Sequence, residues 1–298
     1  MNNIIVIVGP TGVGKTKLSI ELAKKYNGEI INGDSMQVYK GLNIGTAKIK
    51  EEEKENIPHY LFDIKEVDEE YTIYNYQKDT RETIKKITSK NKTPIIVGGT
   101  GLYIKSALYD YKLTKNNNIN NYDNLTTEEL YNLLISKDKE IKNKIDKNNR
   151  RRLINALKYY EENKKSISTN KTNKLLYNTI FIGLTTKRDT LYNIINKRVD
   201  NMIDNGLIEE VKSFYDKNIY TKPLLGGIGY KELYKYFNKE ITKNEAIELI
   251  KKNSRKYAKR QYTFFNNQLP VAWFNTDYNN FNNTITEVCK YIDKEVKK

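Results

Sequence analysis

The stretch VGPTGVGKTKLS, residues 8–19, decides the fold of this chain. It matches the phosphate-loop pattern G-x-x-x-x-G-K-[ST] in full. The apolar run Ile4–Val8 before it predicts a buried parallel strand, and the residues after it predict a helix as far as Tyr26. A loop between such a strand and helix turns its backbone N–H groups and the positive helix end toward a phosphate. The predicted phosphate site consists of Gly9, Pro10, Thr11, Gly12, Val13, Gly14, Lys15 and Thr16.

Within this loop, Lys15 supplies a positive point charge and the Thr16 hydroxyl can coordinate Mg²⁺, which is therefore the expected cofactor. The pattern alone does not say which phosphate compound binds. Phosphate-loop hydrolases also carry an aspartate at the end of an apolar strand. The candidate is Asp34, just after the short strand Glu29–Asn32, and it can be interpreted either as a metal ligand or as a base.

Asp34 and Thr100 each follow a buried strand at its carboxyl end, the edge where an open α/β sheet binds ligands. A carboxylate there can accept a proton from an incoming nucleophile. The plainer interpretation is that Asp34 is a turn residue and Thr100 a helix cap. Position along the chain leaves both interpretations open.

Strands alternate with helices in most of the chain, which predicts an α/β fold with a doubly wound parallel sheet of the P-loop NTPase type. Further buried strands are expected at Pro94–Val97, Thr179–Leu184 and, at an edge, Val271–Asn275. Between residues 111 and 177 two amphipathic helices replace this alternation. We therefore expect a P-loop core with C-terminal helices (1–110 and 178–298) and a helical insert (111–177).

The composition favours a polyanionic partner. The chain has 298 residues and a formal net charge of +15, and between Lys222 and Gln261 there are 11 Lys and Arg against 4 Asp and Glu. Nucleic acid is the first candidate, and a lysine-rich proteome is the alternative explanation. The single cysteine excludes an internal disulfide and a multi-cysteine zinc site. Without a long apolar run or a visible signal peptide, we expect no membrane contact, a cytoplasmic location and a monomer.

Several segments, in this order, resemble the bacterial tRNA dimethylallyltransferases, and the resemblance runs from Ile4 to about Trp273. The most specific group joins Asp34-Ser-Met-Gln37, Tyr39-Lys-Gly41, Gly45-Thr-Ala-Lys48 and Gly98-Gly-Thr100. The other matching segments are GPTGVGKTKLSIELA, IPHYLFDI, LYNIINKRVDNMIDNGLIEEV, GIGYKE and RKYAKRQYTFF.

The resemblance implies transfer of a dimethylallyl group from dimethylallyl diphosphate to the exocyclic amine of an adenosine. This adenosine lies 3′ of the anticodon in tRNAs that read codons starting with U. The phosphate loop then holds a leaving diphosphate, which accounts for the missing hydrolase aspartate. By the same resemblance Asp34 is the base, Thr100 bonds near the amine, Lys15 and Arg188 are catalytic, and Arg152 and Arg188 match two diphosphate-site arginines.

The resemblance also implies the surface that contacts the tRNA anticodon stem-loop. Without it, the segment from Arg255 to Phe265 reads as a basic helix with interleaved aromatic residues, which is also typical of a solvated helix that packs its tyrosines in a core. The implied tRNA-binding residues are Asp34, Ser35, Met36, Gln37, Thr100, Arg151, Arg152, Gly227, Ile228, Gly229, Tyr230, Lys231, Arg255, Lys259, Arg260, Gln261, Thr263 and Phe264.

The chain departs from the family pattern where the family has arginines, at Ile194, Asn155 and Asn266. Two other functions therefore stay open. A small-molecule or nucleotide kinase would share the phosphate loop, could use Arg150–Arg152 in a closing lid, and would make ADP instead of diphosphate. A catalytically inactive RNA-binding protein would bind tRNA without turnover.

Overall fold

The computed structural model describes residues 3–111, 113, 122–169 and 174–297. The chain divides into two compact units, Met1–Leu108 with Tyr177–Lys298, and Tyr109–Leu176. The insert expected at 111–177 includes residues 112, 114–121 and 170–173, which lie outside the described residues.

The larger unit is built on a parallel sheet. Within the described residues it has six strands in the order β3-β2-β4-β1-β5-β6, and each adjacent pair is parallel. This confirms the predicted α/β fold. The two-residue edge strand β3 was not predicted, because it is too short and too exposed for an apolar pattern. The strands are β1 (Ile4–Val8), β2 (Gly28–Asn32), β3 (His59–Tyr60), β4 (Thr93–Val97), β5 (Thr179–Thr185) and β6 (Ala272–Asn275).

Helices cover both faces of this sheet, as buried parallel strands require. On one face α1 (Lys15–Lys25) packs beside α11 (Phe281–Val296), and on the other α2 (Ile73–Thr88) packs beside α3 (Gly101–Leu108). The short 3-10 helix η1 (Glu51–Lys54) lies in the loop before β3. The main core forms between the sheet and α1, around Ile7, Leu18 and Leu22.

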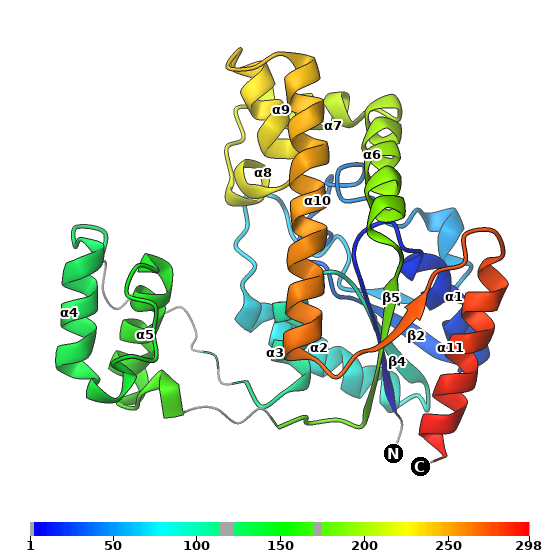
Figure 1. Ribbon diagram of the computed structural model, residues 1–298, viewed down its shortest axis with the longest axis horizontal. Helices are drawn as coiled ribbons and strands as arrows, with labels where there is room; N and C mark the ends of the chain where they lie inside the picture. The colour runs from blue at the N-terminus through cyan, green and yellow to red at the C-terminus, as the bar shows by residue number, and fades with distance from the viewer. Residues whose placement is uncertain (1–2, 112, 114–121, 170–173, 298) are drawn as a thin grey trace. The chain divides into compact units, whose positions relative to one another are not determined.

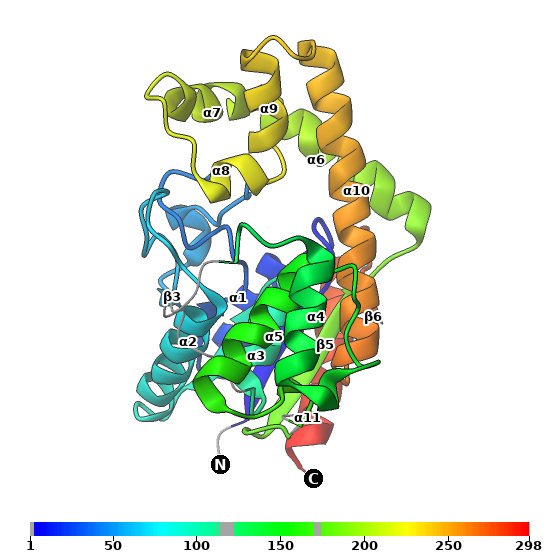
Figure 2. The same ribbon diagram turned by 90° about the vertical axis from the view of Figure 1, so that its left-hand side faces the viewer.

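A second group of helices stands beyond the carboxyl ends of the strands, as Figures 1 and 2 show. These are α6 (Arg188–Asp204), α7 (Leu207–Tyr215), α8 (Lys222–Gly226), α9 (Tyr230–Phe237) and the long α10 (Lys243–Gln268). A capping box begins α10, since Thr242 Oγ1 accepts the Glu245 N–H at 3.3 Å and the Glu245 carboxylate accepts the Thr242 N–H at 2.7 Å. The second half of α10 descends along the sheet and joins this group to the core.

The smaller unit is helical. Its helices are α4 (Thr127–Lys137), η2 (Lys139–Ile141), α5 (Arg150–Asn163) and η3 (Ile167–Thr169). A capping box of Thr126 and Glu129 begins α4. Leu130 and Leu134 of α4 pack with Leu153 and Leu157 of α5 in a core of their own. Among the described residues of the chain, none of the helices combines the length and apolar character that crossing a bilayer needs.

Candidate active site

The phosphate loop leaves β1 and enters α1 through Gly14, whose φ of +91° is left-handed and favours glycine. A Cβ at this position would also lie 2.6 Å from the Phe281 ring of α11. The Thr276 hydroxyl donates to the Val13 carbonyl at 2.9 Å. The segment after β6 therefore supports the phosphate loop through Thr276 and Phe281, a contact that the motif alone did not reveal.

Lys15 is folded back onto its own loop. Its Nζ donates to the carbonyls of Gly9 at 2.9 Å and Pro10 at 2.6 Å. Burial and the nearby guanidinium of Arg198 lower the pKa of Lys15 to about 7, while the Asp34 carboxylate opposes this shift. A bound phosphate anion would stabilise the protonated form of Lys15. Lys15 is therefore suited to take up a proton when it binds an anion.

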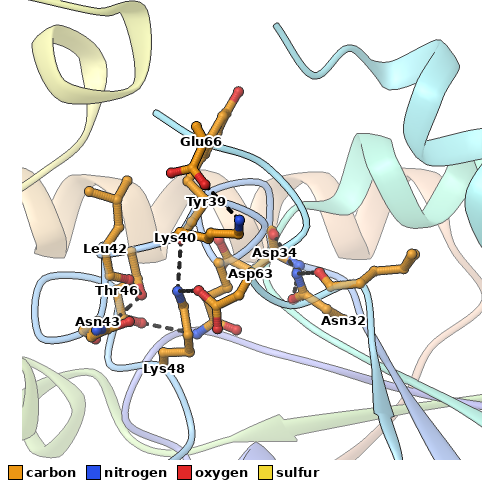
Figure 3. Close-up of polar contacts among 12 residues, drawn as sticks. Asn32, Asp34, Tyr39, Lys40, Leu42, Asn43, Thr46, Lys48, Asp63 and Glu66 are labelled. Carbon is orange, nitrogen blue, oxygen red and sulfur yellow. Dashed lines mark hydrogen bonds and ion pairs between the residues drawn. The ribbon is translucent and has the colours of Figure 1, made fainter. Parts of the chain in front are cut away.

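Asp34 is fixed by the side chain of Asn32 at the end of β2. Asn32 accepts the Asp34 N–H at 2.8 Å and donates to the Asp34 carbonyl at 3.0 Å and the Leu61 carbonyl at 2.9 Å (Figure 3). The Asp34 carboxylate accepts the Met36 N–H at 3.0 Å. Burial raises the pKa of Asp34, against the lowering effects of this amide and of Lys15 and Arg198. A carboxylate with a raised pKa is a better proton acceptor.

Thr100 does lie beside Asp34. The Thr100 hydroxyl accepts the Ser35 N–H at 3.0 Å and contacts the Ser35 hydroxyl at 3.3 Å. The Thr100 N–H donates to the Gly33 carbonyl at 3.0 Å, which ties the turn after β4 to the turn after β2. The two strand ends that the sequence singled out are therefore joined directly.

A cavity of about 940 Å³ is lined by Lys15, Asp34 and Ser35, whereas Thr100 is not among its lining residues. Lys15 and Thr16 lie at its phosphate-loop side, Asp34 and Gly99 at the strand ends, and apolar side chains such as Ile195, Val199 and Met202 form another wall. A site with cations, one half-buried carboxylate and an apolar wall can hold a molecule that carries a phosphate and a hydrocarbon group. The predicted residues that line it are Thr11, Gly12, Gly14, Lys15, Thr16, Asp34–Gln37, Gly227–Lys231, Arg260 and Gln261.

Arg198 of α6 lines this cavity and was missed in the sequence. A signal was available, because Leu191, Ile195, Arg198 and Met202 follow helical spacing, so that the half-buried arginine falls on the inward-facing stripe. An arginine on such a stripe is rarely there for packing alone. The neighbouring Ile194 packs on the phosphate loop, and its Cγ2 atom would lie 2.7 Å from a Cβ built on Gly12.

Other predicted residues lie away from the cavity lining. Arg188 is exposed at the start of α6, 5.1 Å from the ring centroid of Tyr192, and is not among the lining residues. Arg151 and Arg152 are exposed in the first turn of α5, in the smaller unit. The assigned roles of these three arginines stay predictions.

The predicted RNA-contacting residues of α10 divide between surface and interior. Lys259 and Thr263 are exposed, and Arg255 donates to Asn196 at 2.5 Å. Phe264 packs against Gly101, where a Cβ would lie 2.2 Å from its ring. Gln261 is buried against the turn after β4, where it donates to the Gly99 carbonyl at 3.0 Å.

Glu210 of α7 holds the loop that follows Asp34. Its carboxylate accepts the backbone N–H groups of Asn43 at 3.0 Å, Ile44 at 2.7 Å and Gly45 at 3.1 Å. It also accepts the hydroxyl of Tyr230, which is fully buried, at 2.6 Å. A Cβ on Gly45 would lie 2.6 Å from that tyrosine ring, so the ring and the loop touch directly.

The same loop is bonded internally. Lys48 Nζ donates to the Tyr39 carbonyl at 2.8 Å and pairs with Asp63 at 2.5 Å (Figure 3). The Thr46 hydroxyl donates to the Leu42 carbonyl at 2.6 Å. Gln37, which lines the cavity, donates to the Thr46 carbonyl at 3.0 Å. These bonds hold together residues 37–48, of which Gln37, Gly45, Thr46 and Ala47 line the cavity.

Fold and site together define a phosphate-loop α/β protein in which the loop lysine and a half-buried carboxylate line one cavity. The model of the IPP transferase family matches residues 37–268. The tRNA dimethylallyltransferases of Anoxybacillus flavithermus and Bacillus subtilis are 50% and 47% identical, over 97% and 92% of this chain and 96% and 92% of their own lengths. The chain belongs to the IPP transferase family.

Solved structures agree. A tRNA isopentenylpyrophosphate transferase from Staphylococcus epidermidis is 43% identical, with a TM-score of 0.75 over 99% of this chain and all of that one. A eukaryotic dimethylallyltransferase acting on tRNA is 29% identical, with a TM-score of 0.89 over 99% of this chain and 79% of its own. The expected family resemblance is confirmed.

Proposed function

We propose that this chain is a tRNA dimethylallyltransferase. It moves a dimethylallyl group from dimethylallyl diphosphate to the exocyclic amine of the adenosine 3′ of the anticodon, in tRNAs reading codons that start with U, and releases diphosphate. The observation that carries the proposal is the arrangement of Lys15, Arg198 and Asp34 in one cavity, where both cations act on the pKa of the Asp34 carboxylate.

The residues act on two parts of the reaction, the departure of the diphosphate and the loss of a proton from the amine. The amine nitrogen attacks the allylic carbon, the C–O bond to the diphosphate breaks, and negative charge builds on the leaving oxygens. Lys15, Arg198 and the loop amides stabilise that charge. The alkylated nitrogen becomes acidic and passes its proton to Asp34, whose raised pKa suits it as the acceptor.

The proposal also assigns roles to apolar side chains of the cavity and to a bound Mg²⁺ ion. Ile195, Val199 and Met202 give the five-carbon chain a water-poor surface. Mg²⁺ would neutralise charge on the leaving diphosphate. Among the described residues there is no cluster of three or more His, Cys, Asp or Glu that could hold a metal. The exposed Thr16 hydroxyl, with the substrate's phosphate oxygens and waters, fits the way Mg²⁺ is commonly bound.

The adenine must leave the anticodon stack to reach a carboxylate inside the cavity. Gln37 and the Gly227–Lys231 segment line the cavity, and exposed cations such as Lys259 lie further along α10. These residues are our candidates for the RNA contact, together with the arginines of α5. A tRNA substrate also implies a cytoplasmic location.

The test is transfer of radiolabelled dimethylallyl from its diphosphate to an anticodon stem-loop with adenosine 3′ of the anticodon, in the presence of Mg²⁺. We expect labelled RNA with the natural chain and a loss of at least 100-fold with Asp34→Asn, a near-isosteric change that removes the base. ADP formed from ATP without labelled RNA would instead indicate a kinase. Tight, salt-sensitive RNA binding without turnover would indicate an inactive binding protein.

A further inference from the structure

A buried hydrogen bond joins the phosphate loop to a segment far along the chain. The Thr276 hydroxyl donates to the Val13 carbonyl at 2.9 Å, across 263 positions of sequence. Val13 is fully buried and Thr276 is 8% exposed. Thr276 lies beyond the family match at residues 37–268 and beyond the resemblance that ends near Trp273. The family resemblance therefore gives this bond no role.

The bond determines which way one amide of the phosphate loop points. A peptide unit is planar and trans, so its C=O and N–H groups point to opposite sides. The Val13 carbonyl points to Thr276, and the Gly14 N–H of the same peptide unit therefore points away from Thr276. Gly14 lines the cavity, whereas Thr276 is not among its lining residues. Phosphate loops bind anions through such N–H groups, so the orientation of this peptide matters for a bound phosphate.

The segment that carries Thr276 is itself held in place. The Thr276 N–H donates to the Thr185 carbonyl at the end of β5 at 2.8 Å. Further along the segment, the Phe281 ring lies 2.6 Å from the position that a Cβ on Gly14 would take. The ammonium group of Lys17, which also lines the cavity, lies 5.0 Å from the centroid of the same ring. The segment thus contacts the phosphate loop through a hydrogen bond and an aromatic ring, and that ring also holds a cation of the cavity.

We propose that Thr276 is a positioning residue for the diphosphate part of the reaction. Its hydroxyl holds the Val13–Gly14 peptide in the orientation in which the Gly14 N–H can donate to a phosphate oxygen. Without this bond the peptide would be free to turn, and diphosphate binding would have to fix it at a cost in affinity. The inference rests on the proposed function, since that function gives the loop a diphosphate to hold. It adds a part of the chain beyond the family match to the substrate site.

The experiment measures the binding of inorganic diphosphate to the full chain by calorimetry, in the presence of Mg²⁺. Thr276→Val keeps the shape of the side chain and removes the hydroxyl donor, so the dissociation constant for diphosphate should rise by about two- to tenfold. The dissociation constant for the anticodon stem-loop, measured separately, should stay unchanged. Thr276→Ser keeps the hydroxyl and should restore the natural affinity for diphosphate.

Thr284→Val is the matched control, because it removes another buried hydroxyl close by on α11. The Thr284 side chain is 1% exposed and its hydroxyl accepts the Asp277 N–H at 2.9 Å. Its loss should lower the stability and leave the affinity for diphosphate unchanged, and urea unfolding shows whether the two valine variants lose similar stability. A second measurement needs no variant to fold. In the natural chain, bound diphosphate should slow hydrogen exchange at the Gly14 amide.

Unchanged diphosphate affinity in Thr276→Val, or equal losses of affinity in both valine variants, would overturn the assignment. A Gly14 amide whose exchange diphosphate does not slow would overturn it as well. Failure of the proposed function would look different, because the natural chain would then transfer no label to RNA. A positive transfer assay together with unchanged diphosphate affinity in Thr276→Val would reject this inference alone, and a natural chain that binds no diphosphate would overturn both.

Discussion

The Glu210 carboxylate accepts the backbone N–H of Gly45 at 3.1 Å across 165 positions of sequence. The same carboxylate also holds Asn43, Ile44 and the Tyr230 hydroxyl. Glu210 does not line the cavity, yet it ties together two segments that do, the loop with Gly45 and the segment with Tyr230. It is a positioning residue for the side of the site assigned to RNA.

Glu210→Gln should therefore raise the KM for the RNA by about tenfold, because an amide NH₂ would face backbone donors that need an acceptor. The KM for dimethylallyl diphosphate should change much less. Glu209→Gln is the matched control, since Glu209 is the exposed neighbour on α7. Steady-state kinetics with each substrate varied in turn checks the split, and equal changes in both KM values would contradict the assigned role.

Gly45→Ala should destabilise the protein by about 1–3 kcal/mol, since the added Cβ would lie 2.6 Å from the Tyr230 ring. Gly226→Ala is the control, because a Cβ there meets nothing within 4 Å and should change the stability by about 0.5 kcal/mol or less. Urea unfolding of both variants measures the difference. Similar losses of stability would show that the Tyr230 contact is not tight.

Arg198→Gln should raise the KM for dimethylallyl diphosphate by roughly 10- to 100-fold, the size expected for one lost charged hydrogen bond. Arg188→Gln serves as the comparison, because Arg188 is exposed over Tyr192 and outside the cavity lining. We expect the larger effect at Arg198. A larger effect at Arg188 would favour the role that the family resemblance gives it, and would require α6 to move when substrate binds.

Diphosphate binding should take up a proton above neutral pH. Lys15 has a pKa of about 7 in the free protein against an ordinary 10.5, and a bound anion raises it again. At about pH 8.5 binding should therefore consume more protons than at pH 6. Calorimetry in buffers of different ionisation enthalpy measures this uptake, and subtracting the result for Lys15→Met removes the protons taken up by the ligand itself.

The same shift has a defined effect on stability. Between about pH 7 and 10.5 the unfolded chain holds a proton on Lys15 that the folded chain has lost. Lys15 should therefore destabilise the fold most below pH 7, and this cost should shrink as the pH rises through that window. Urea unfolding at pH 6 and pH 9, compared with Lys15→Met, tests the sign. A destabilising effect of Lys15 on the free energy of unfolding that grows with pH would contradict the lowered pKa of Lys15.

The sheet was predictable because its strands are short β-branched runs, and because one motif fixes the loop and the helix that come after β1. The Thr242 and Thr126 capping boxes were predictable for a similar reason, since their bonds are local. Asp34 and Thr100 could be paired from topology, as both lie just after parallel strands at one edge. In each case the determining contacts lie within a few residues or result from strand direction.

Long-range contacts were not predictable in this way. Nothing in a local pattern distinguishes Glu210 from the exposed Glu209, and only the fold shows which carboxylate meets the 43–45 amides. Gln261 was expected at an RNA surface, and its burial depends on how α10 packs over Gly99. The helical spacing of α6 could have predicted that Arg198 points inward. The family resemblance pointed to Arg188 of the same helix instead.

Helix α10 runs unbroken from Lys243 to Gln268, 26 residues that extend about 39 Å. Ala246 and Ile250 pack among the outer helices and fix the rotation of α10 about its axis. That rotation also determines which way Tyr257, Arg260 and Gln261 point at the cavity. One residue inserted near Lys252 would leave the helix intact and turn everything after it by about 100°. The number of residues between Ile250 and Tyr257 is therefore a requirement of the site, like its side chains. Between these two residues, substitutions should be tolerated far better than insertions or deletions.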